Sequence, residues 1–134
     1  MEISKLIERA IDAKGRAYAP YSGFKVGAAL LAEEGEIFTG CNIENAAYSP
    51  TNCAERTAFF TAISFGITKF KAIAIVGGMG DELTENCFPC GVCRQVMMEF
   101  CAPNFTIIIA QSPEKFTTHT LEEILPYGFG PSNL

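Results

Sequence analysis

The chain is short of basic residues: Lys and Arg number 10 against 15 Asp and Glu, and the formal net charge is −5. A protein that grips nucleic-acid backbones needs a basic face, so no nucleic acid is expected as a partner. Long apolar runs are also missing, and no stretch approaches the roughly 18 residues that cross a bilayer. Residues 1–5 lead straight into an amphipathic pattern without a signal peptide. We therefore expect a cytoplasmic protein with a small substrate and no membrane partner.

Histidine occurs once, as His119, in a polar stretch far from the cysteine motifs, where we expect a surface position. A hydrolytic triad is therefore not credible. Six cysteines could form a disulfide scaffold, but the spacing of Cys90 and Cys93 is typical of metal or redox sites in reducing compartments. Hydrophobic residues make up 49% of the 134 residues, which is enough to build a hydrophobic core. We therefore expect a single domain that spans residues 1–134.

Two short stretches dominate what is present. The first is Cys53-Ala54-Glu55-Arg56, and the second, residues 89–95, reads Pro-Cys-Gly-Val-Cys-Arg-Gln. Cys53, Cys90 and Cys93 are a plausible zinc set that leaves the fourth tetrahedral position open, as a catalytic zinc requires. Glu55 would then handle protons. Residues two apart do not share a helix face, so Cys53 must lie at the very start of its helix, where Arg56 can fold back towards its sulfur.

Periodicity predicts the elements around these stretches. Apolar residues at helical spacing predict a first helix that ends between residues 15 and 18. Residues 24–32 and 37–42 form a predicted antiparallel hairpin, and the small residues 27–29 indicate a helix pressed against its first strand. Further helices are predicted from residue 52 or 53 to 66, at 91–101 and at 121–125, buried strands at 72–76 and 105–110, and loops at 77–80 and 126–131. A hairpin that feeds β-α-β units gives an α/β fold with a mixed sheet and helices on both faces.

With these motifs in this order, from about Tyr21 to Phe129, the chain closely resembles the small homotetrameric cytidine deaminases. The resemblance also includes Cys41-Asn42-Ile43-Glu44-Asn45-Ala46. It implies a three-layer α-β-α sandwich, one zinc ion (Zn²⁺) per chain, and sites shared between the four chains. The reaction it implies is hydrolytic deamination of cytidine and deoxycytidine, in pyrimidine salvage, by attack of zinc-activated hydroxide at C4.

The resemblance also implies substrate contacts. Alternation along the second strand puts Asn42 and Glu44 on one face. From this pattern alone, a solvated strand end is as good an interpretation as a sugar site, whereas the family binds the ribose 3′-hydroxyl with this pair. Backbone N–H groups at a helix start, such as that of Ala54, can bind the pyrimidine oxygen. The family's other contacts fall on Phe24, Asn45, Ala46 and Tyr48, and on Phe129, which reaches into a neighbour's site.

Three alternatives stay open. The first is a related deaminase of another aminopyrimidine, of the blasticidin type. The second is a structural zinc module, whose site would close with a fourth ligand that Cys87 could supply. The third is a thiol redox protein, which needs only Cys90 and Cys93. Apart from that possible ligand role, we expect Cys41, Cys87 and Cys101 to be buried thiols.

Overall fold

The computed structural model describes residues 1–84 and 86–134, which form five strands and four α-helices around one sheet. In chain order the elements are α1 (Ile3–Lys14), β1 (Phe24–Ala32), β2 (Ile37–Cys41), α2 (Ala54–Ser64), β3 (Phe70–Met79), α3 (Gly91–Phe100), β4 (Thr106–Ala110), β5 (Phe116–Thr120), α4 (Leu121–Ile124) and a final 3-10 turn (Pro131–Asn133). Each of these helices is too short or too polar to cross a bilayer.

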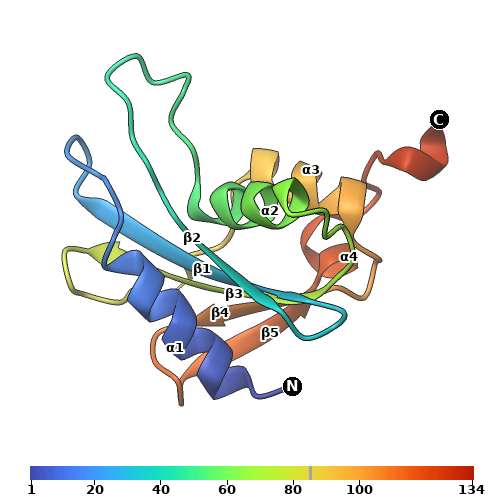
Figure 1. Ribbon diagram of the computed structural model, residues 1–134, viewed down its shortest axis with the longest axis horizontal. Helices are drawn as coiled ribbons and strands as arrows, with labels where there is room; N and C mark the ends of the chain where they lie inside the picture. Colours follow the sequence, from blue (N-terminus) through green and yellow to red (C-terminus); the bar gives the residue numbers. More distant parts are fainter. Residues whose placement is uncertain (85) are drawn as a thin grey trace.

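The sheet has the order β2-β1-β3-β4-β5 and is mixed. Antiparallel pairing joins β1 to β2, β1 to β3 and β4 to β5, while β3 and β4 run parallel through the crossover helix α3. Figure 1 shows α1 against one face of the sheet and α2, α3 and α4 against the other. The predicted three-layer α-β-α sandwich with a mixed sheet is confirmed.

Alternate residues of the central strands supply two separate cores. Ile73 and Ile75 point towards α2 and α3, whereas Ala72 and Ala74 pack beneath α1. Where a helix crosses the sheet, a glycine in the strand lets the helix backbone contact the strand backbone directly. A Cβ at Gly27 would lie 2.0 Å from the carbonyl oxygen of Ala10 in α1, which confirms the close helix predicted from the small residues of β1.

The structure corrects two sequence-based expectations. The first is the loop predicted at residues 77–80: β3 continues to Met79, and Gly77 and Gly78 pair with Val26 and Lys25 of β1. Glycine is needed here because the backbone at Glu82 packs directly on the strand. A Cβ at Gly78 would lie 2.1 Å from the carbonyl oxygen of Glu82.

The second correction is the edge strand β5, which the sequence analysis missed. Its side chains are exposed or half-buried, and it therefore lacks the apolar run by which β3 and β4 were found. His119 lies on this strand. Its ring is half-buried and packs edge-on against Phe88 with centroids 4.9 Å apart, so it is less exposed than expected.

Candidate metal centre

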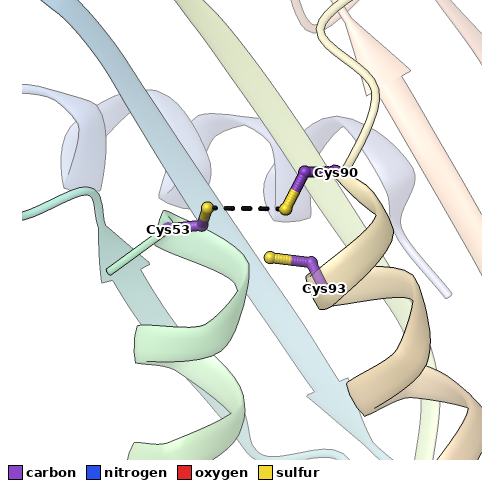
Figure 2. Close-up of side chains that lie close together, drawn as sticks. All are labelled: Cys53, Cys90 and Cys93. Atoms are coloured by element: carbon purple, nitrogen blue, oxygen red, sulfur yellow. Dashed lines mark hydrogen bonds between the residues drawn. The ribbon is translucent and has the colours of Figure 1, made fainter. Parts of the chain in front are cut away.

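The three thiols of the two cysteine motifs converge between the starts of two helices (Figure 2). Cys53 is the N-cap of α2, Cys90 is the N-cap of α3, and Cys93 lies in the first turn of α3. Their sulfur atoms lie within 4.8 Å of one another. Cys53 has extended backbone (φ −76°, ψ 155°), as its position at the helix start requires, so its side chain and that of Glu55 both reach the same cavity.

The donor set fits zinc. Tetrahedral zinc with Zn–S bonds of 2.3 Å places its sulfur ligands about 3.8 Å apart, and the Sγ atoms of Cys53 and Cys90 are 3.7 Å apart. Among the described residues, this cluster of three is the only group of His, Cys, Asp or Glu that could hold a metal. Cys87 lies outside it. Three protein ligands leave one tetrahedral position free for water or substrate, whereas a structural site would use a fourth ligand.

Positive charge faces the sulfurs. Arg56 donates from Nη2 to Sγ of Cys53 at 3.3 Å, and its buried Nε has no hydrogen-bond partner among the described residues. A hydrogen bond from the Cys93 thiol and the contact with Arg56 lower the pKa of Cys53 to about 5 despite its burial. The bond to Cys53 raises the pKa of Cys93. The cluster therefore readily provides its first thiolate, the form that binds a metal.

Glu55 is the buried acid of the site, with 4% of its surface exposed. Burial raises its pKa to about 7, and the nearby charge of Cys53 adds to the effect. A carboxyl group with a pKa near neutrality can both accept and donate a proton at physiological pH.

A cavity of about 210 Å³ opens beside the thiols. Its walls contain seven residues expected from the sequence: Phe24, Asn42, Glu44, Cys53, Ala54, Glu55 and Cys90. Sequence analysis missed Val26, Thr51, Asn52 and Phe88 as wall residues, and it did not predict that Cys87 would line this cavity. No short motif marks these residues, which fold topology brings together.

The remaining expected contacts lie elsewhere. Asn45 and Tyr48 line an adjoining cavity of about 390 Å³, which shares Glu44 and Thr51 with the first. Ala46 is exposed beside them. Phe129 is 59% exposed and absent from the walls of its own chain's thiol-lined cavity.

Asn42 and Glu44 are both fixed by bonds within the chain. Asn42 accepts from the Val26 amide and donates to the Phe24 carbonyl, each at 2.8 Å. Glu44 accepts from the hydroxyl of Ser22 and from the amides of Ser22 and Tyr21. These bonds, with the Ser22 hydroxyl as the largest contribution, lower the pKa of Glu44, so it is an ionised acceptor at neutral pH. Each side chain keeps hydrogen-bonding capacity for a ligand.

The cysteines outside the cluster differ from Cys53 in their acidity. Cys41, Cys87 and Cys101 are half-buried rather than fully buried. Burial raises the pKa of Cys87 and that of Cys101 to about 12, and also raises the pKa of Cys41. Such thiols are poor nucleophiles.

Comparison with known proteins adds to this geometry. The family model for the cytidine and deoxycytidylate deaminase zinc-binding region matches residues 1–109, a span that contains all three thiols. A cytidine deaminase from Sporosarcina psychrophila is 47% identical over 134 residues, 100% of this chain and 96% of that protein. A probable cytidine deaminase from Dictyostelium discoideum is 38% identical, covering 99% of this chain and 87% of that protein.

Solved structures agree with the sequence relatives. The crystal structure of cytidine deaminase from Burkholderia pseudomallei matches with a TM-score of 0.86 at 44% identity, covering 96% of this chain and all of that one. The structure of cytidine deaminase from Mycobacterium tuberculosis gives 0.77 at 37% identity, covering 94% and 95% of the two chains. The similarity therefore extends over nearly the whole fold.

Proposed function

The chain belongs to the cytidine and deoxycytidylate deaminase family, and from this we propose that it is a zinc-dependent enzyme that hydrolyses the 4-amino group of cytidine and deoxycytidine. The products are uridine or deoxyuridine and ammonia, a reaction of pyrimidine salvage. The observation that carries the proposal is one small cavity lined by Cys53, Cys90 and the buried acid Glu55. Within residues 1–84 and 86–134, three thiols converge and no fourth His, Cys, Asp or Glu joins them, which favours a catalytic site over a structural zinc module.

We assign the metal to Cys53, Cys90 and Cys93, one ion per chain. When bound there, zinc supplies a Lewis acid that activates water for attack. Three thiolates would over-neutralise its charge of +2. The N-termini of α2 and α3, each worth roughly half a positive charge, and the hydrogen bond from Arg56 to Cys53 offset this excess. Arg56 therefore keeps the centre electrophilic.

We assign the proton transfers to Glu55. Its carboxylate takes a proton from the attacking water as the oxygen adds to C4 of the pyrimidine. It passes that proton to ring N3, then takes the second proton from the new C4 hydroxyl and delivers it to the amine, so that the C4–N4 bond breaks as the C4 carbonyl forms. One water is consumed, one ammonia leaves, and nothing is oxidised or reduced. A pKa of about 7 suits a group that must both accept and donate within one turnover.

Nucleoside recognition falls to the other cavity residues. The ionised Glu44 can accept from a ribose hydroxyl, and the second amide hydrogen of Asn42 can donate to it. We place the pyrimidine between Phe24 and the start of α2, where the Ala54 N–H can bind the ring oxygen. Asn45, Ala46 and Tyr48 would border this site from the adjoining loop. A cavity of about 210 Å³ suits a nucleoside better than a polynucleotide.

An ultraviolet assay with cytidine, deoxycytidine and free cytosine, combined with a zinc count, tests this function. We expect both nucleosides to be deaminated with stoichiometric ammonia release, and one zinc per chain. A zinc protein inert to all three compounds but active on another aminopyrimidine would support the blasticidin-type alternative. X-ray absorption would separate the structural module, because four sulfur neighbours indicate a closed site.

We further propose a cytoplasmic homotetramer whose chains share sites, with Phe129 stacking on a neighbour's pyrimidine. Phe129 is largely exposed and lies outside its own chain's cavity, and Tyr127 beside it is fully exposed, which supports an interface here. Mixing two inactive variants tests this: one chain cut after Pro126, the other carrying Glu55→Gln. Partial return of activity on co-refolding is expected. Mixed tetramers without activity would refute sharing.

A further inference from the structure

Arg94, immediately after the metal ligand Cys93, bridges two segments that lie far apart in the sequence. Its Nε donates to the carbonyl of Pro89 at 2.7 Å, and its Nη1 donates to the carbonyl of Ile124 at 2.6 Å. Pro89 is buried and directly precedes Cys90. Ile124 ends α4, where a helical carbonyl lacks a partner within the helix. The guanidinium thereby holds the peptide in front of Cys90 against α4.

The next residue, Gln95, holds the C-terminal tail. Its Nε2 donates to the carbonyl of Phe129 at 2.8 Å. One turn further along α3, on the same face, Met98 packs beneath the tail. A Cβ at Gly128 would lie 3.0 Å from Met98 Sδ, and one at Gly130 would lie 3.1 Å from Met98 Cε. The tail backbone is therefore docked on α3 at several points, while the Phe129 side chain stays 59% exposed.

From these contacts we propose that Arg94 and Gln95 are positioning residues with separate targets. Arg94 sets the position of the metal ligand Cys90, and Gln95 sets the position of Phe129. Because both lie on α3, the helix whose start carries Cys90 and Cys93, one rigid element links metal ligation to presentation of the aromatic side chain. The significance of Phe129 for substrate rests on the proposed function, but the two docking roles do not.

Three measurements on matched variants separate the roles. Gln95→Ala removes the docking bond, Gln95→Glu keeps the shape but cannot donate to a carbonyl at neutral pH, and Glu99→Ala changes an exposed residue of the same helix as the control. Arg94→Lys keeps the charge, but a single ammonium cannot reproduce the fork that serves two carbonyls. Arg94→Gln replaces it if the lysine variant does not fold. The readouts are kcat and KM for cytidine, zinc transfer to 4-(2-pyridylazo)resorcinol, and chymotrypsin cleavage of the tail.

For both Gln95 variants we expect KM to rise roughly two- to tenfold, the value of one amide–carbonyl hydrogen bond, with faster cleavage at Phe129. Their kcat and zinc transfer should match those of Glu99→Ala. For Arg94→Lys we expect zinc transfer to accelerate about tenfold, since a hydrogen bond from a charged group is lost, and kcat to fall.

Two results would overturn the proposal. One is a Gln95→Ala variant whose KM and cleavage rate equal those of Glu99→Ala. The other is loss of stability, metal and turnover to the same extent in the Arg94 and Gln95 variants, as general destabilisation would produce. A parent enzyme that does not deaminate cytidine would refute the proposed function instead, and the zinc-transfer and cleavage rates would still decide the positioning roles.

Discussion

Replacing Glu55 by Gln is the most direct test of proton transfer in this site. The change exchanges one carboxylate oxygen for an amide nitrogen at nearly constant volume, in a position that is only 4% exposed. Packing at the start of α2 is preserved, so the three thiols should keep their arrangement and their zinc. Glutamine can still form hydrogen bonds at this position, but it cannot accept a proton and release it again.

The expected loss follows from the acidity of the group. With a pKa of about 7, Glu55 is half protonated at neutral pH, close to the optimum for a residue that acts as base and then as acid. General acid–base roles contribute roughly 10²- to 10⁴-fold. The kcat of Glu55→Gln should therefore fall by that factor, which corresponds to about 3 to 5 kcal/mol in the activation free energy.

The assay follows the loss of cytidine absorbance at saturating substrate, together with zinc content by mass spectrometry and thermal unfolding. Glu8→Gln is the matched control, because Glu8 is an exposed acid of α1, on the opposite face of the sheet. We expect the control to behave as the parent does. A Glu55→Gln enzyme with full zinc content and turnover within a few-fold of the parent would remove Glu55 from the mechanism.

Three further predictions concern the ligands, the charge balance and the fold. Cys53→Ala should lose zinc and activity together, and full zinc retention by elemental analysis would refute the ligand assignment. Arg56→Gln should lower kcat while leaving the free energy of unfolding nearly unchanged, and it should move the pH–rate profile to higher pH, because a more negative site releases protons less readily. An unchanged profile and rate would show that the bond from Arg56 to Cys53 does not tune the metal centre. Gly27→Ala should lower the free energy of unfolding by about 1–3 kcal/mol, since its Cβ would lie 2.0 Å from Ala10 O. Calorimetry checks this, and an unchanged melting temperature would contradict it.

Features encoded over a few residues could be predicted from the sequence. Cys53 and Glu55 cannot share a helix face, which fixed the start of α2 at Cys53, and the structure has its N-cap there. The hairpin of β1 and β2, and the close approach of α1 at Gly27, followed from alternation and side-chain size. Each of these inferences rests on backbone periodicity, which does not depend on distant parts of the chain.

Features that depend on tertiary contacts could not be predicted. The strand β5 pairs with β4 along its backbone edge, while its own side chains are exposed or half-buried, so no apolar pattern marks it. Its one local signal is β-branching at Thr117, Thr118 and Thr120, which is weak without the tertiary context. Sequence spacing also left Cys87 open as a fourth ligand. The fold resolves whether Cys87 is a fourth ligand, because its sulfur packs over Gly77 in β3. A Cβ added at Gly77 would lie 2.4 Å from this sulfur. Cys87 thus lies on the wall of the cavity rather than in the metal cluster.

Asn42 and Glu44 show why a structural and a functional interpretation of the same residues need not compete. Their bonds to the Phe24 carbonyl, the Val26 amide and the turn at Ser22 would by themselves explain an amide and a carboxylate at these positions. Those bonds also immobilise both polar groups on the wall of the cavity that contains the thiols. Binding a hydroxyl there would cost little further side-chain entropy, because the rotamers of Asn42 and Glu44 are already fixed. The fold thus supplies the preorganisation that the proposed sugar site would need.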